Sequence, residues 1–468
     1  MDLWLRFWFC VNSLRPAFSR EQSFWIFLLA LVGMCIRTEY AGVTSLVRAL
    51  HLQPLFYRRF LNLFNSGAWS VEGLTKVWVG WVLKVFGQYK VNGRIVLVAD
   101  GVKAPKEGRR MPAVKSLHQE SESNSKPEFI MGHSFQAVAL LFRLGKAVWS
   151  VPLACRIHEG IVKSNRDRRS LHHKLANLLV EVTAAMSKLT RRYLVADAYY
   201  SCETMIKALL LGGDDLVSRV KSNAVAYSPV ETAGSKGRGR PKKYGQKIKL
   251  KELFRERSNF RRATVNGYGT EKTEVDYYAL DLLWKPVGRV VRFILVTYPN
   301  RGRCTFVSTD LKLDPVMAIE MYAMRFKIEV SFKQAIRTLG AFAYHFWLKS
   351  MPRIKRHSGN QYLHRQTAEY RQLVDKKLES YHKHVMLALV AQGFMQYLST
   401  YFSAEVYAFA PWLRTMTASG HPSEETVAAA LRTALPDFIA RTPNAHPLKK
   451  FLLSIRYGKG CGAEKLAA

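Results

Sequence analysis

The apolar positions of the chain follow two periods, one helical and one strand-like. Up to about residue 90, apolar residues recur at helical spacing with short breaks at 52–54 and 65–67, which predicts an N-terminal helical domain. From Arg94 onward, runs rich in β-branched residues alternate with a helix-length segment at 168–189 and with a second helix that Ser201 would cap. The strand-like runs are 95–100, 133–141, 146–156, 192–197 and 215–221. This order predicts an α/β fold, a mixed sheet covered by helices.

A strongly basic stretch interrupts the strand pattern after residue 221. Residues 236–262 hold 12 Lys or Arg against two Glu, a local net charge of +10 (12 − 2). Strand-like runs resume at 275–283, 289–298 and 304–311, so we expect a basic, mostly β insertion. Asp314 followed by Pro315 is typical of a helix start and predicts one helix to about Gly340. The expected parts are 1–90 (helical, DNA-binding), 91–221 (first part of the core), 222–311 (insertion and return strands), 312–343 (core helix) and 344–468 (basic helical region).

The charge balance points to a nucleic-acid partner. The chain has 71 Lys or Arg and 35 Asp or Glu, which gives a formal net charge of +36. A surface this positive favours a polyanion. The longest apolar run, 24–36, is too short to cross a bilayer and no signal-peptide pattern is present, so we expect a cytoplasmic, nucleoid-associated protein without a membrane partner. The six cysteines form no C-x-x-C pair, which argues against a disulfide framework and a zinc knuckle.

Two acidic residues end strand-like runs with the same four letters. Leu97-Val-Ala-Asp100 and Leu194-Val-Ala-Asp197 are the only such echo along the chain. Neighbouring strands would present these two carboxylates at the same edge of a sheet. A single Asp at a strand end is more often a turn former than a catalyst, and the repeated setting makes the two readings about even.

A third carboxylate lies on the predicted helix around residue 329. Tyr322, Arg325, Glu329 and Lys333 share one helix face beside an apolar stripe, which would hold Glu329 at the margin of the core. The alternative is a surface row of charge pairs at i, i+4 spacing. Three carboxylates on rigid elements suit a pair of divalent cations acting on a phosphodiester. The sequence has no P-loop and therefore no phosphate-binding loop of the kind that nucleotide-hydrolysing enzymes use.

These segments resemble a known family. IVLVADGVK, RYLVADAYYS and YAMRFKIEVSFK, the last with Y-x2-R-x3-E spacing, resemble the DDE transposases of bacterial insertion sequences. The resemblance implies an RNase H-like core with helices on both faces, interrupted by a β insertion. It also implies that Asp100, Asp197 and Glu329 are catalytic ligands of Mg²⁺ or Mn²⁺, as a pair of ions, and that Tyr322 and Arg325 contact DNA phosphate.

One position departs from the pattern of that family. A Lys is usual seven residues after the Glu, and this chain has Ile336 there. Lys333, one turn beyond Glu329, or Arg337, next to the expected place, would take over the phosphate contact.

A second DNA contact is expected in the basic insertion. Arg238-Gly-Arg240-Pro241 resembles a hook that enters the DNA minor groove, and Lys242 and Lys243 follow it. A basic loop that contacts phosphates without sequence preference is an equally good reading.

The resemblance and the charge together lead to a functional hypothesis. We expect a DNA transposase of the cut-and-paste type, which cleaves the ends of its element, transfers the strands to double-stranded target DNA and acts as a dimer in the synaptic complex. The alternatives are a DNA-binding protein without catalysis, an inactivated transposase acting as a repressor, and a structure-specific nuclease that does not transfer strands.

Overall fold

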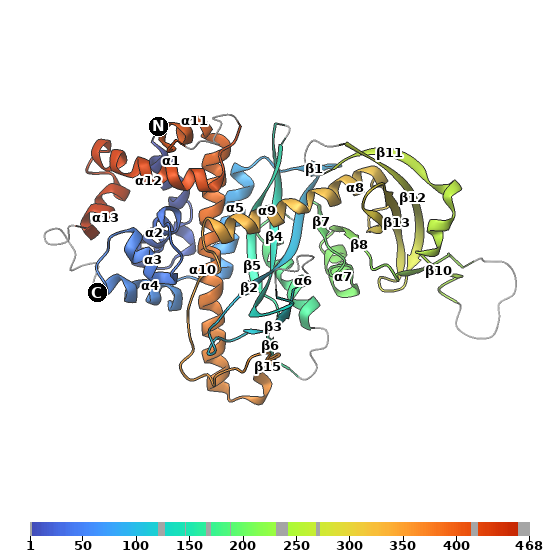
Figure 1. Ribbon diagram of the computed structural model, residues 1–468, viewed down its shortest axis with the longest axis horizontal. Coiled ribbons are helices and arrows are strands. Elements are labelled where there is room, and N and C mark those ends of the chain that lie inside the picture. The colour runs from blue at the N-terminus through green and yellow to red at the C-terminus, as the bar shows by residue number, and fades with distance from the viewer. Residues whose placement is uncertain are drawn as a thin grey trace.

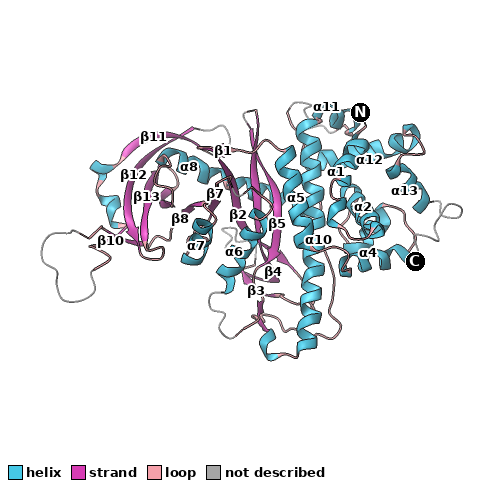
Figure 2. Ribbon diagram, turned by 180° about the vertical axis from the view of Figure 1, so that it is seen from behind, coloured by secondary structure: helices cyan, strands magenta, loops and turns pink. Residues whose placement is uncertain are grey.

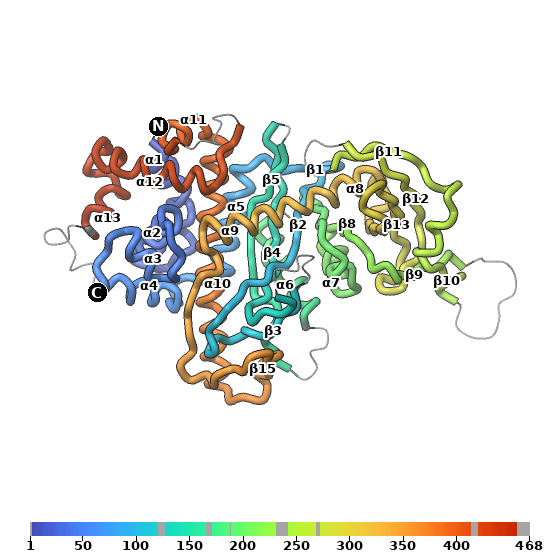
Figure 3. Tube along the Cα trace, viewed as in Figure 1, coloured from blue at the N-terminus to red at the C-terminus, as the bar shows by residue number. Residues whose placement is uncertain are grey.

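The computed structural model describes residues 2–119, 127–145, 147–164, 170–187, 189–230, 242–267, 272–412 and 420–456. In Figure 1 a group of helices lies on the left, a long vertical helix stands beside it, and a sheet extends from there to the right. Figure 3 follows the same path as a continuous trace.

The first helices are built as the apolar spacing predicts. Residues 24–36 are almost wholly buried, so the longest apolar run of the sequence is a core helix. Side-chain caps start two of the helices: Asp2 accepts from the Trp4 amide and Ser70 from the Gly73 amide. Among the described residues, no helix has the length and apolar content needed to cross a membrane. The helices are α1 (Leu3–Asn12), α2 (Glu21–Ile36), α3 (Gly42–Ala49), α4 (Leu55–Asn65) and α5 (Val71–Val85).

The C-terminal helices pack against the N-terminal ones. The Trp4 indole donates to the Leu431 carbonyl at 3.0 Å, and the longest helix, α10, contacts α2 and α4. The apolar spacing of the sequence predicts a helix over 378–402, but α10 begins ten residues earlier, at a Thr367 cap, because its first turns carry exposed charges in place of an apolar stripe. These helices are α10 (Ala368–Tyr401), α11 (Ser403–Phe409), α12 (Glu424–Arg441) and α13 (Pro447–Arg456).

The centre of the molecule is a mixed sheet in the order β5-β4-β2-β7-β8. Strands β5, β4 and β2 are antiparallel, whereas β2, β7 and β8 are parallel. Helices flank this sheet, which is the RNase H-like arrangement expected from the sequence (Figure 2). Its elements are β1 (Lys90–Val91), β2 (Arg94–Pro105), β3 (Lys115–His118), β4 (Phe129–Leu144), β5 (Ala147–Ile157), β6 (Ile161–Val162), α6 (Ser170–Thr183), β7 (Arg192–Ala196), α7 (Glu203–Leu211) and β8 (Asp215–Arg219).

The predicted β insertion continues the central sheet. Its last strand, β14, pairs antiparallel with β8, with Ser308 opposite Val217. Trp284 is buried and packs edge-on against Phe293 at 5.8 Å, so it is a core residue of this part. The strands are β9 (Val225–Tyr227), β10 (Lys247–Lys249), β11 (Arg261–Asn266), β12 (Lys272–Trp284), β13 (Arg289–Tyr298) and β14 (Gly302–Ser308). The domain boundaries proposed from the sequence remain predictions.

The helix expected from Asp314 to about Gly340 is interrupted. Asp314 does cap its start, where its side chain accepts from the Met317 amide at 2.9 Å. At Arg325 the backbone forms i, i+3 bonds, which divide the segment into α8 (Pro315–Met324) and α9 (Phe326–Arg337). After α9 the chain runs to the short strand β15 (Gln361–Tyr362), which pairs with β6.

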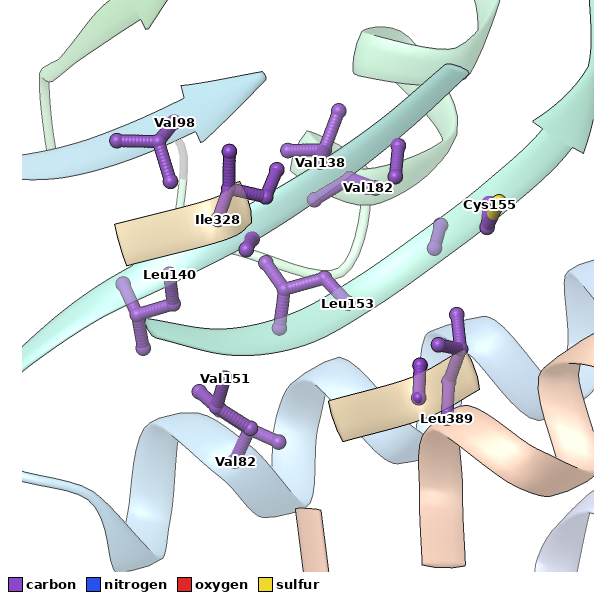
Figure 4. Packing of buried hydrophobic residues seen from close by; sticks show 14 of the residues in the cluster. Val82, Val98, Val138, Leu140, Val151, Leu153, Cys155, Val182, Ile328 and Leu389 are labelled. Carbon is purple, nitrogen blue, oxygen red and sulfur yellow. The ribbon is translucent and has the colours of Figure 1, made fainter. Parts of the chain in front are cut away.

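The apolar side of α9 fixes that helix to the sheet. Figure 4 shows Ile328 of α9 among Val98 of β2 and Val138 and Leu140 of β4, all of them buried. Burying an Ile side chain stabilises the fold by about 1.5–3 kcal/mol. Because Ile328 is the residue before Glu329, this packing sets the position of that carboxylate.

Candidate active site

Two carboxylates lie where the parallel pairing of β2 with β7 ends. Asp197 directly follows β7, whereas Asp100 lies inside β2, which continues to Pro105, so the expectation that Asp100 ends its strand is wrong. β2 and β7 pair in parallel with Ala99 opposite Ala196, so Asp100 and Asp197 follow at the same edge of the sheet. Both strands are buried up to these residues, and the rigid core therefore determines where the two side chains begin.

The Asp100 carboxylate is held on both oxygens. Its side chain is 15% exposed, Oδ1 accepts from the Gly101 amide at 2.8 Å, and Oδ2 is paired with the Arg325 guanidinium. Burial raises the pKa of Asp100, and the positive charge of Arg325 opposes that shift. Without a cation beside it, this carboxylate would be costly to keep ionised.

Asp197 is oriented by the turn that follows β7. Its Oδ1 accepts from the Tyr199 amide at 3.1 Å, and its backbone carbonyl accepts from the Ser218 hydroxyl of β8 at 2.7 Å. The neighbouring parallel strand therefore fixes the backbone at this position.

Arg325 links the strand ends to the helix. Its guanidinium pairs with Asp100 and, at 3.0 Å, with Oε1 of Glu329 one turn further on. Burial works against its charge, but Asp100, Tyr322 and Glu329 together raise its pKa above the usual value. The ring of Tyr322 lies under it, 5.6 Å from the guanidinium carbon, and packs on Phe306. The structure thus brings Asp100, Glu329, Arg325 and Tyr322 into one contact network.

The remaining predicted DNA contacts lie on the surface. Lys333 and Arg337 are exposed on α9, as is Ile336 at 44%. Lys242 and Lys243 are exposed at the start of the segment leading to β10. Arg238 and Arg240 lie outside the described residues.

Sequence reasoning missed two residues beneath the acids. The Tyr200 hydroxyl donates to the Gln136 side chain at 2.5 Å, and both groups are buried. A Cβ on Gly101 would come within 2.8 Å of Gln136 Nε2, so the Asp-Gly sequence of β2 leaves room for this amide. The signal in the sequence was the second Tyr after Asp197, a polar aromatic directly beyond a buried strand.

The chemical type of these side chains suits a divalent cation. Oxygen donors at rigid strand ends are what Mg²⁺ and Mn²⁺ prefer. Within the described ranges, no three acidic, His or Cys side chains are close enough to hold one ion together. Arg325 carries the balancing positive charge, and its buried Nε lacks a hydrogen-bond partner. The donor set is suited to a metal, and Arg325 stands where it would compete with one.

An RNase H-like sheet with acidic residues side by side on adjacent parallel strands defines a class of enzymes that act on nucleic-acid phosphodiesters. Residues 13–272 match the family described as DDE superfamily endonuclease, and this is more than half of the chain. The protein therefore belongs to the DDE superfamily endonucleases. The match includes Asp100 and Asp197 and ends before Glu329.

Two further comparisons add little to that assignment. No curated protein matches the sequence. A cryo-EM structure of a piggyBac transposase synaptic complex with hairpin DNA is similar at a TM-score of 0.38 and 11% identity, over 98% of this chain and 85% of that one. This TM-score is too low to establish a shared arrangement, so the family assignment depends on the sequence match.

Proposed function

We propose that the protein is the transposase of a bacterial insertion sequence, which cleaves the ends of its element and transfers the strands to target DNA. The observation that carries this proposal is the pairing of β2 with β7, which sets Asp100 beside Asp197 and within reach of the Arg325–Glu329 pair. Membership of the DDE superfamily endonucleases and a net charge of +36 support a DNA substrate.

Asp100, Asp197 and Glu329 would hold Mg²⁺ or Mn²⁺ in this proposal. When bound, a pair of such ions makes the attacking oxygen more nucleophilic and stabilises the leaving oxygen of a phosphodiester. The guanidinium of Arg325 partly opposes the rise in the pKa of Asp100 that burial causes, and so favours the ionised form of this ligand. Gly101 and Tyr199 donate their amide protons to Asp100 and Asp197 and so orient the two carboxylates.

The cations around the acids would bind DNA phosphates. Tyr322 and Arg325 lie at the acids, and Lys333 and Arg337 are exposed further along α9. In the insertion, Arg238, Arg240, Lys242 and Lys243 would contact the groove or the backbone of the same DNA. Arg325 must release at least one carboxylate when it turns to a phosphate, so substrate binding and opening of the acid site are linked.

Joining two ends to one target requires two active sites, so we infer a dimer in the synaptic complex. We also infer that the protein works at the nucleoid in the cytoplasm, where its substrate lies.

Purified protein, element-end DNA and Mg²⁺ test the proposal. Products in which an element end is joined to target DNA are expected. Cleavage without joining would instead indicate a structure-specific nuclease. Binding without cleavage would indicate a repressor, the outcome that Ile336 makes worth testing.

A further inference from the structure

An open pocket of about 440 Å³ lies at the C-terminal end of β2. It begins at Pro105, which is about 16 Å along the strand from Asp100 at the usual rise per residue. Its other sides come from the start of β4 and from the coil after α9. The pocket and Asp100 are therefore positioned by the same strand.

The walls of the pocket are fixed by backbone hydrogen bonds. The Ile354 amide donates to the Arg109 carbonyl at 2.8 Å, and the Leu348 amide donates to Arg110 at 2.9 Å. On the opposite side, the Lys106 amide donates to the Met131 carbonyl at 2.9 Å. The pocket is thus largely formed before a ligand arrives, which lowers the entropy cost of binding.

The lining combines an apolar interior with cations. The apolar residues are Pro105, Val114, Ile130, Met131 and Ile354. The charged residues are Lys106, Arg109, Lys355 and Arg356 against Glu107, and all except Lys106 are exposed. Apolar walls suit the face of a nucleobase, and exposed cations suit the phosphates on either side of it.

Two neighbouring features match the same chemistry. Trp347 is 64% exposed, and its Nε1 lies 3.1 Å from where a Cβ on Gly108 would be, so the indole borders the pocket. The sequence holds no Asp or Glu between Glu329 and Glu369, so the coil carries cations without neighbouring acids. A volume of this size holds one nucleotide and excludes a duplex.

We propose that this pocket binds one unpaired nucleotide of the DNA substrate, with the base between the apolar walls and the adjoining phosphates on Arg109, Lys355 and Arg356. Trp347 offers a stacking surface at the entrance. This inference rests on the proposed function, because it assigns a further contact to the same DNA. It also implies that the bound DNA is unpaired at one position near the acids.

The test compares two DNA duplexes bound to the full chain without divalent metal. One duplex is fully paired, and the other has a single unpaired 2-aminopurine whose fluorescence reports stacking. Wild type is expected to bind the second at least about fivefold more tightly, the lower end of the effect of stacking one base. Equal affinity for the two duplexes would overturn the proposal.

Two matched variants locate the site. Lys355→Gln with Arg356→Gln is expected to remove the preference, because these side chains line the pocket. Lys349→Gln with Arg353→Gln removes the same charge from exposed positions of the same coil that are not among the lining residues, and should keep it. The first pair of substitutions should also lower the salt-dependence slope of DNA binding by about 2. A preference that survives in the first variant would place the nucleotide elsewhere.

Further measurements distinguish a free nucleotide from DNA as the ligand, and failure of this inference from failure of the proposed function. If dAMP alone binds as tightly as the duplex with the unpaired base, the pocket is a site for free nucleotides and the DNA assignment is wrong. Cleavage of element ends by wild type that shows no preference for the unpaired base would overturn only this inference. A protein that keeps the preference but never cleaves would overturn the proposed function instead.

Discussion

The two charged regions of the molecule each hold a cation: partly buried Arg325 beside the acids and buried Lys106 at the basic pocket. Arg325 contacts Asp100 and Glu329, and its pKa is raised. Lys106 donates to the carbonyls of Phe342 and Tyr344 and stacks over the Tyr344 ring, with its nitrogen 3.7 Å from the ring centre. Burial lowers the pKa of Lys106 to about 7.

The difference shows what keeps a charge inside this fold. Carbonyl oxygens and an aromatic face interact with a cation but leave its charge unbalanced. A carboxylate accepts hydrogen bonds from the cation and also balances its charge. The carboxylates therefore keep Arg325 protonated, and another cation could take its place beside them. The pocket instead holds a lysine that sheds its proton near neutral pH. Four measurements test this contrast.

The largest effect is expected from Asp100→Asn. Cleavage of element-end DNA should fall by at least about 100-fold, because one oxygen ligand and the partner of Arg325 are both lost. DNA binding without metal should stay within about twofold, since the positive surface is intact. Asp281→Asn is the control, because Asp281 of β12 pairs with Arg292 of β13, away from the site. Undiminished cleavage by Asp100→Asn would show that the acid site is not catalytic.

The next effect is the pH dependence of stability that Lys106 contributes. The pKa of Lys106 is about 7 when folded and about 10.4 when unfolded, so the unfolded chain binds more protons between these values. This term should raise the free energy of unfolding with pH by up to about 1.4 kcal/mol per unit in that window. Denaturant unfolding from pH 7 to 9 should show the rise in wild type and a smaller one in Lys106→Met.

Lys103→Met is the control for that experiment, because Lys103 lies on the same strand and is exposed. It should follow the wild-type pH dependence. Identical slopes for all three proteins would mean that Lys106 stays charged at pH 7.

Arg325→Gln should have a smaller effect on stability, about 1–2 kcal/mol, because the site is only partly buried and the lost contacts are two hydrogen-bonded ion pairs. Mg²⁺ should then raise the melting temperature of the variant more than that of wild type, because the acids lack their internal cation. Arg292→Gln, which removes a pair on the sheet surface, should show no such gain. If Mg²⁺ raised the melting temperature of Arg325→Gln and of wild type equally, Arg325 would not compete with the metal for the acids.

The smallest effect is expected from Ile336→Lys. Ile336 is exposed on α9, so a lysine there replaces no core contact. The variant should bind DNA a few-fold more tightly, with a salt-dependence slope increased by about 0.9. Ile336→Gln, which adds polarity without charge, should leave the slope unchanged. If the lysine also leaves it unchanged, no phosphate lies near this turn of α9.

The sequence indicated the sheet core well because buried parallel strands read as continuous apolar runs. The runs ending at Asp100 and Asp197 therefore predicted β7 and the buried first part of β2, and the β-rich order predicted the fold class. The continuation of β2 to Pro105 was missed, because its residues beyond Asp100 are mostly exposed or half-buried. The break at Arg325 was not visible, because i, i+3 bonds at one residue leave the helical spacing of apolar positions nearly unchanged. The start of α10 was missed because its first turns are charged on exposed faces.

The contacts of the candidate site were harder to predict than its residues. Helical spacing placed Arg325 and Glu329 on one face, but only the packing of Ile328 on the sheet shows that Arg325 reaches Asp100. Gln136 lies within a buried run of β4, where nothing in the pattern separates a supporting amide from its neighbours. Local periodicity carries no information about which distant strand a side chain will meet.

The pairing of β14 with β8 has a mechanical consequence. Because Ser218 of β8 holds the Asp197 carbonyl, the outer strands and this carboxylate belong to one hydrogen-bonded framework. Such a framework twists as a whole and offers no hinge between the outer strands and the acids. DNA bound by the strands of the β insertion would therefore reach the candidate site at a fixed angle. The double helix, and not the protein, would have to bend.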